Sequence, residues 1–73
     1  MEKGWVKIAT YSNELTAELA KLALEQNGVM AVLLNKQDSS LKFGRIELFV
    51  QENDQIKAAE IKETNDTDGL NEN

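Results

Sequence analysis

The residues best suited to binding chemistry gather in one polar segment, NKQDSSLKFGR, which lies between two apolar stretches. From Lys36 to Arg45 it carries three bases and one acid, a local charge of +2; because the formal net charge is −5, the rest of the chain carries −7. Turn amides, serine hydroxyls and flanking bases together can hold a carboxylate or a phosphate. The candidate residues of this ligand or partner loop are Asn35, Lys36, Asp38, Ser39, Ser40, Lys42, Gly44 and Arg45.

A second interpretation of the same segment is a solvated hairpin connection. Asp38 and Ser39 would then bond local amides, and Gly44 would supply a positive φ. The segment has one glycine and no GK[ST] sequence, so it is not a phosphate-binding P-loop. The sequence leaves both interpretations open.

The other polar residues give little basis for catalysis or metal binding. The chain has no histidine and no cysteine, which removes the commonest general base and the commonest transition-metal ligands. Glu14 and Glu18 share a helical face, but that face is the solvated one, opposite the apolar stripe, which favours a surface role over an acid–base pair. Asp66 and Asp68 imitate the start of a calcium loop, yet no bidentate acid follows at the required distance. We therefore expect a protein that is not an enzyme and holds no cofactor or metal.

Hydrophobic periodicity predicts the elements that would position these residues. The order is strand, helix, strand, strand, helix, over residues 5–11, 14–27, 29–34, 45–50 and 54–63. Ser12 or Asn13 is the expected N-cap of the first helix, and Gly28 its expected left-handed C-terminal residue. The residues expected to be buried on the two helices are Leu15, Leu19, Leu22 and Ala23, and then Ile56, Ala59 and Ile61.

This order predicts an α+β fold, a ferredoxin-like plait that lacks its last strand. A right-handed crossover would place both helices on one face of a three-stranded sheet, with the third strand between the first two and antiparallel to both. We expect one domain over residues 1–63. Residues 64–73 are acidic and poor in apolar groups, which predicts a disordered tail and leaves the edge of residues 5–11 open.

The sheet face turned away from the helices is a second candidate site. Strand alternation predicts that Trp5, Lys7, Tyr11 and Phe49 lie on it, so that three of the chain's four aromatic residues share an uncovered surface. Patches of this kind mark interaction surfaces, and homodimerisation is their simplest use. In the alternative interpretation, long side chains such as Lys7, Arg45 and Glu47 shield the face from water.

The sequence also resembles a known family over about residues 5–62. The similarity rests on the turn YSNE, the helix segment AELAKLALEQNG, the loop NKQDSS with its later FG, and the strand IELFV. These residues resemble the family described as putative prokaryotic signal-transducing proteins, which is related in shape to the PII signalling fold. The resemblance implies a plait with a regulatory or binding role, and it carries no ligand or catalytic residue with it.

Composition indicates where the protein acts and which classes of partner it binds. No stretch approaches the roughly 20 apolar residues that span a bilayer, and the start MEKGWVK has no signal-like apolar run, so we expect a cytoplasmic protein away from membranes. The acidic balance argues against nucleic acid as a partner. We expect a protein-interaction module of signal transduction, and the competing hypothesis is a PII-type sensor that binds a small anion at residues 35–45.

Overall fold

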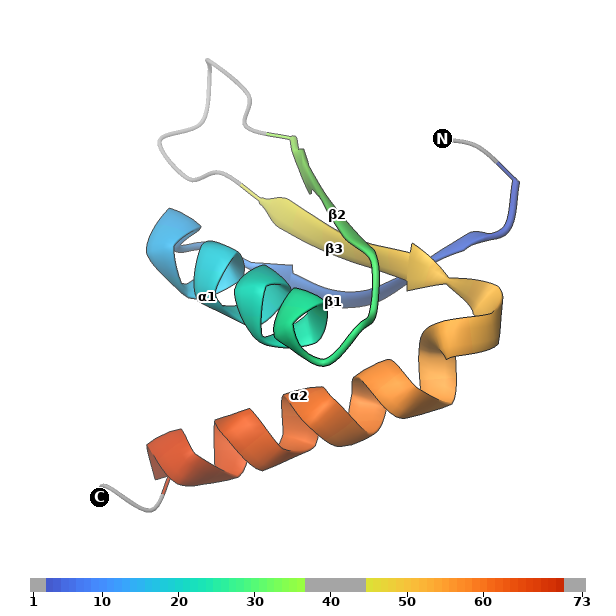
Figure 1. Cartoon of the computed structure of the whole chain (residues 1–73). Helices are drawn as coiled ribbons and strands as arrows, with labels where there is room; N and C mark the ends of the chain where they lie inside the picture. Colours follow the sequence, from blue (N-terminus) through green and yellow to red (C-terminus); the bar gives the residue numbers. More distant parts are fainter. Residues whose placement is uncertain (1–2, 37–44, 71–73) are drawn as a thin grey trace.

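The computed structural model describes residues 3–36 and 45–70, with residues 65–70 described as backbone only. Figure 1 shows three strands forming one sheet, with two helices packed against it. The elements are β1 (Trp5–Tyr11), α1 (Glu14–Gln26), β2 (Ala31–Asn35), β3 (Ile46–Gln51), a short 3-10 turn (Glu52–Asp54) and α2 (Gln55–Leu70).

The sheet has the predicted topology. Its strand order is β1-β3-β2, and β3 is antiparallel to both neighbours. The α+β plait and its β-α-β-β-α order are therefore confirmed. Within residues 3–36 and 45–70 no fourth strand forms, so the outer edge of β1 has no strand beside it in that part of the chain.

Both ends of α1 follow the local signals of the sequence. Asn13 is the N-cap, and its side-chain oxygen accepts a hydrogen bond from the Thr16 amide at 2.9 Å. At the other end, Gly28 has φ +81°, and its amide and that of Val29 donate to Glu25 and Leu24 carbonyls at 3.0 Å and 2.9 Å. This pair of bonds is a Schellman motif. It turns the chain sharply from α1 into β2.

A bulge in β1 changes which residues face the helices. The register with β3 shifts between Lys7 and Ala9, so that Ala9 pairs with Leu48 and Tyr11 with the buried Ile46. The extra residue reverses the alternation beyond it. Tyr11 therefore packs against the core on the helix side, and its predicted place on the uncovered face is wrong.

The hydrophobic core lies between the sheet and the helices. Its buried cluster is formed by Leu24, Val29, Ala31, Leu48, Val50 and Ala58. Because Leu24 belongs to α1 and Ala58 to α2, both helices cover the same face of the sheet, as predicted.

Helix α1 is rotated relative to the predicted orientation. It buries Ala17 and Leu24, whereas Leu15, Leu19 and Leu22 are exposed. The helix is apolar on two sides, and the side that carries Ala17 and Leu24 faces the sheet. The predicted burial of the leucine stripe is therefore wrong.

Helix α2 also differs from its predicted form. It buries Ala58, while Ile56 and Ala59 are exposed and only Ile61 of the predicted set is half-buried. It continues to Leu70, past the predicted end near Glu63. A helix that is already nucleated adds residues at little cost, and the chain contains no proline to stop it.

Candidate interaction surface on the sheet

The face of the sheet opposite the helices is the candidate site, and we call it the open sheet face. Directly paired residues of neighbouring strands share a face, and so do alternate residues along a strand. Lys7 and Val32 are both paired with Phe49, and Thr10 and Leu34 are both paired with Glu47. The open sheet face consists of Trp5, Lys7, Thr10, Val32, Leu34, Glu47, Phe49 and Gln51, with Lys36 at its margin.

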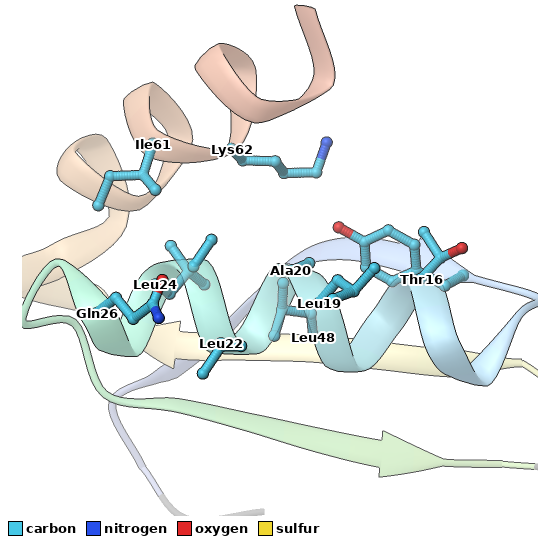
Figure 2. Close-up of a pocket in the computed structure, with 11 residues that line it drawn as sticks. Thr16, Leu19, Ala20, Leu22, Leu24, Gln26, Leu48, Ile61 and Lys62 are labelled. Atoms are coloured by element: carbon cyan, nitrogen blue, oxygen red, sulfur yellow. The ribbon is translucent and has the colours of Figure 1, made fainter. Parts of the chain in front are cut away.

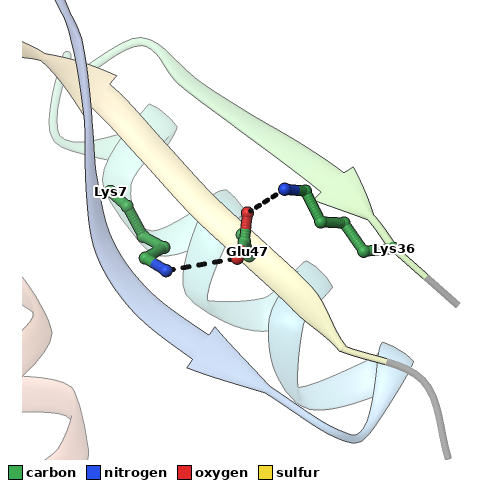
Figure 3. A network of polar contacts seen from close by, with 3 residues as sticks. All are labelled: Lys7, Lys36 and Glu47. Atoms are coloured by element: carbon green, nitrogen blue, oxygen red, sulfur yellow. Dashed lines mark hydrogen bonds and ion pairs between the residues drawn. The ribbon is translucent and has the colours of Figure 1, made fainter. Parts of the chain in front are cut away.

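A carboxylate shared by two lysines stands at the centre of this face. Lys7 Nζ on β1 lies 3.2 Å from Glu47 Oε2, and Lys36 Nζ beyond β2 lies 3.6 Å from Glu47 Oε1. Figure 3 shows the two lysine side chains reaching Glu47 from opposite sides, with α1 behind the sheet. This cluster ties all three strands together by charge.

The Glu47 side chain is only 7% exposed, although it lies on the face that carries no helix. Strands on both sides and the stems of two lysines cover it. A carboxylate withdrawn from water in this way needs charged or hydrogen-bonding partners, and the two ammonium groups supply them. A partner would therefore contact the exposed lysines of this cluster, whereas Glu47 lies beneath them.

The same contacts set the acidity of Glu47. The hydrogen bond from Lys7 lowers the pKa of the Glu47 carboxyl below its ordinary value, and Lys36 acts in the same direction. Removal from water raises the pKa but does not outweigh the lysines. Glu47 is ionised at neutral pH, so the cluster carries two positive charges and one negative charge.

Of the residues predicted for this face, the structure brings Trp5, Lys7 and Phe49 together and excludes Tyr11. Trp5 and Phe49 are half-buried, so each keeps part of its ring accessible. Glu47 was expected on this face only as a shielding side chain and was not among the candidate interface residues. The available signal was an acid in the middle of IELFV, the strand predicted to be central.

The predicted loop is described only at its two ends. The Lys36 amide donates to the Arg45 carbonyl at 2.7 Å, which extends the β2–β3 pairing beyond the strands. Asn35 is the last residue of β2. The predicted positions Asp38, Ser39, Ser40, Lys42 and Gly44 lie outside the described residues.

Comparison with known proteins places this fold in a family. The family model described as putative prokaryotic signal transducing protein matches residues 5–64. The chain belongs to this family. No curated protein and no solved structure matches it. The matched residues cover every strand and both helices as far as Thr64, and thus the whole open sheet face.

Two other features are absent from residues 3–36 and 45–70. None of the helices in this part of the chain is both long and apolar enough to cross a membrane. The acidic side chains of the same part form no group of three or more that could hold a metal ion.

Proposed function

We propose that the protein is a non-enzymatic module of signal transduction that acts in the cytoplasm by binding a partner protein through the open sheet face. The family description supports the signalling role in general terms. The observation that carries the proposal is the surface itself, where the Lys7–Glu47–Lys36 cluster adjoins two accessible aromatic rings.

The chemistry of this surface suits a protein partner. Aromatic side chains contribute large contact areas, and they are enriched in the residues that dominate binding energy at interfaces. Lys7 and Lys36 remain 46% and 58% exposed while bound to Glu47, so their ammonium groups can still meet carboxylates of a partner. We expect a partner that presents apolar side chains to the two aromatic rings and acidic side chains to the two lysines.

The test is affinity capture from native cell lysate with three baits. These are the wild-type chain, the double variant Trp5→Ala/Phe49→Ala, and the control Ile56→Ala, whose side chain is 78% exposed on α2. Circular dichroism would first establish that all three are folded. A specific prey should bind the wild type and the control and be lost from the double variant. A prey that binds the folded double variant as well as the wild type would contradict the proposal.

A second copy of the chain is the first partner to test. Sedimentation at tens of micromolar should show a dimer for the wild type and a monomer for Trp5→Ala/Phe49→Ala if the open sheet face pairs with itself. A monomer in both cases would exclude a second copy of the chain as the partner.

A second candidate function is sensing of a small anion at residues 35–45, and the exposure of the base at its start favours it, since the Lys36 side chain is 58% exposed. Lys36 lies at the start of that segment and also contacts Glu47, so an anion that engaged Lys36 would compete with Glu47 for its charge. Titration of isotope-labelled protein with phosphate and nucleotides should then shift the amides of Lys36, Arg45 and Glu47. Unchanged spectra at millimolar ligand would exclude this function.

A further inference from the structure

The helix side of the molecule carries a second apolar surface. On α1, the exposed fractions of Leu15, Leu19 and Leu22 are 67%, 56% and 47%. Their spacing of i, i+4 and i+7 places them in one row along the helix, and successive residues turn by about 100°. Leu24 lies on the opposite side of α1, where it is buried. The row of leucines therefore points away from the core.

A cleft adjoins this row. It lies between α1 and α2 and has a volume of about 400 Å³. Leu19 and Ala23 contribute from α1, Ile61 and Lys62 contribute from α2, and Leu48 of β3 is also part of its wall. Figure 2 shows Ile61 and Lys62 projecting from α2 toward α1. The exposed leucines and the cleft share Leu19 and Leu22, so they form one continuous apolar groove, which we call the helix groove.

The charges beside the helix groove are mainly negative. Helix α1 carries three glutamates and one lysine, and the lysine, Lys21, is already paired with Glu25 at 3.0 Å. Glu14 and Glu18 are separated by one turn and lie along the same flank of the leucine row. On α2, Glu60 is exposed at a smaller neighbouring hollow that shares Ile61 with the cleft, and Lys62 adds one positive charge to the cleft wall.

We propose that the helix groove binds a basic amphipathic helix of a partner protein. An amphipathic helix places apolar side chains at i, i+3, i+4 and i+7, which is the spacing needed to pack against Leu15, Leu19 and Leu22. The basic side chains beside those anchors would meet the glutamates of α1. This site is separate from the open sheet face, because the sheet lies between the two.

A second copy of this chain fits the helix groove less well. Pairing the exposed leucines of two α1 helices would bring the glutamates of both copies together, and like charges at such distances oppose association. A basic partner would instead form favourable ionic contacts with the same glutamates. The negative charge of α1 therefore favours a basic helix over a second copy of this chain.

The test uses two synthetic helical peptides of about 18 residues, roughly 27 Å long. Both carry leucines at i, i+3, i+4 and i+7; one has lysines and the other glutamates at the flanking positions. Binding to the full chain would be measured by calorimetry and by amide shifts of the isotope-labelled protein. The protein variants are Leu19→Gln/Leu22→Gln and, as a matched control, Ile56→Gln, which changes an exposed apolar residue that does not line the cleft.

The lysine peptide should shift the amides of α1 and Ile61 and leave those of Lys7 and Phe49 unchanged. The glutamate peptide should bind at least about tenfold more weakly than the lysine peptide, and raised salt should lower the affinity of the lysine peptide. Leu19→Gln/Leu22→Gln should also weaken binding at least about tenfold, because two apolar anchors are lost, while Ile56→Gln keeps wild-type affinity. Equal affinity for the two peptides, or wild-type affinity in the folded leucine variant, would overturn the proposal. So would a wild-type dimer that Leu19→Gln/Leu22→Gln dissociates, since a second copy would then be the occupant.

Discussion

The orientation of α1 can be tested by replacing two of its leucines separately with alanine. Leu24 is 1% exposed, and replacing a buried leucine by alanine costs about 2–5 kcal/mol of the free energy of unfolding. Leu15 is 67% exposed, so only about a third of its side chain is removed from water. Since burying a whole leucine contributes about 1.5–3 kcal/mol, Leu15→Ala should cost no more than about 1 kcal/mol. The two variants should therefore differ by at least about 1 kcal/mol and by as much as about 5 kcal/mol.

Urea denaturation, followed by circular dichroism and by the fluorescence of Trp5, would measure both variants. A chain of 73 residues has a total stability of about 4–11 kcal/mol, so Leu24→Ala removes a large share of it. With a slope of about 1 kcal/mol per molar urea, its midpoint should fall by about 2–5 M, against about 1 M or less for Leu15→Ala. Equal losses, or a larger loss for Leu15→Ala, would show that the leucine row is buried and would refute the orientation of α1.

Protein concentration provides the control for this comparison. If a second copy covered the leucine row, the stability lost in Leu15→Ala would increase with protein concentration, because association stabilises the folded state by mass action. We expect the difference between wild type and Leu15→Ala to be the same at about 5 and about 100 μM.

Three further predictions follow from single contacts. The folded state lowers the pKa of the Glu47 carboxyl, so the stability that the ionised carboxylate contributes is complete above the ordinary pKa of 4.5 and is lost as the pH falls below that value. Glu47→Gln should therefore flatten the pH dependence of the urea midpoint below pH 4.5. A midpoint curve parallel to that of wild type would contradict this role of Glu47. Gly28→Ala places a Cβ where no atom lies within 4 Å, so its cost is the strain of φ +81°, about 1–2 kcal/mol by denaturation, and a neutral result would argue against the left-handed turn. Asn13→Ala removes the acceptor of the Thr16 amide and should cost about 1 kcal/mol, which Asn13→Ser should largely restore; equal losses in both variants would exclude capping as the cause.

Local signals made much of the fold predictable. The capping side chain of Asn13 and the left-handed Gly28 are decided by neighbouring residues, and the strand order follows from short connections and chirality. The bulge beyond Lys7 was not predictable in this way, because it arises from the match between β1 and β3, which are far apart in sequence. One extra residue was enough to move Tyr11 from the predicted binding face into the core.

The rotation of α1 escaped prediction for a related reason. Its sequence contains two apolar rows, and hydrophobic periodicity favours the row with the larger side chains. Which row faces the sheet depends on the space available, and here Ala17 and Leu24 occupy it. The central role of Glu47 likewise depends on two lysines that meet it only after the strands have paired.

The shared carboxylate couples the two margins of the sheet. Lys7 and Lys36 share the single negative charge of Glu47. If one lysine loses its contact with Glu47, the ion pair between Glu47 and the other lysine becomes stronger. Thermodynamic reciprocity requires the effect to run equally in both directions. Acetylation of Lys36, for example, would remove its positive charge and strengthen the ion pair between Lys7 of β1 and Glu47, without any movement of the backbone.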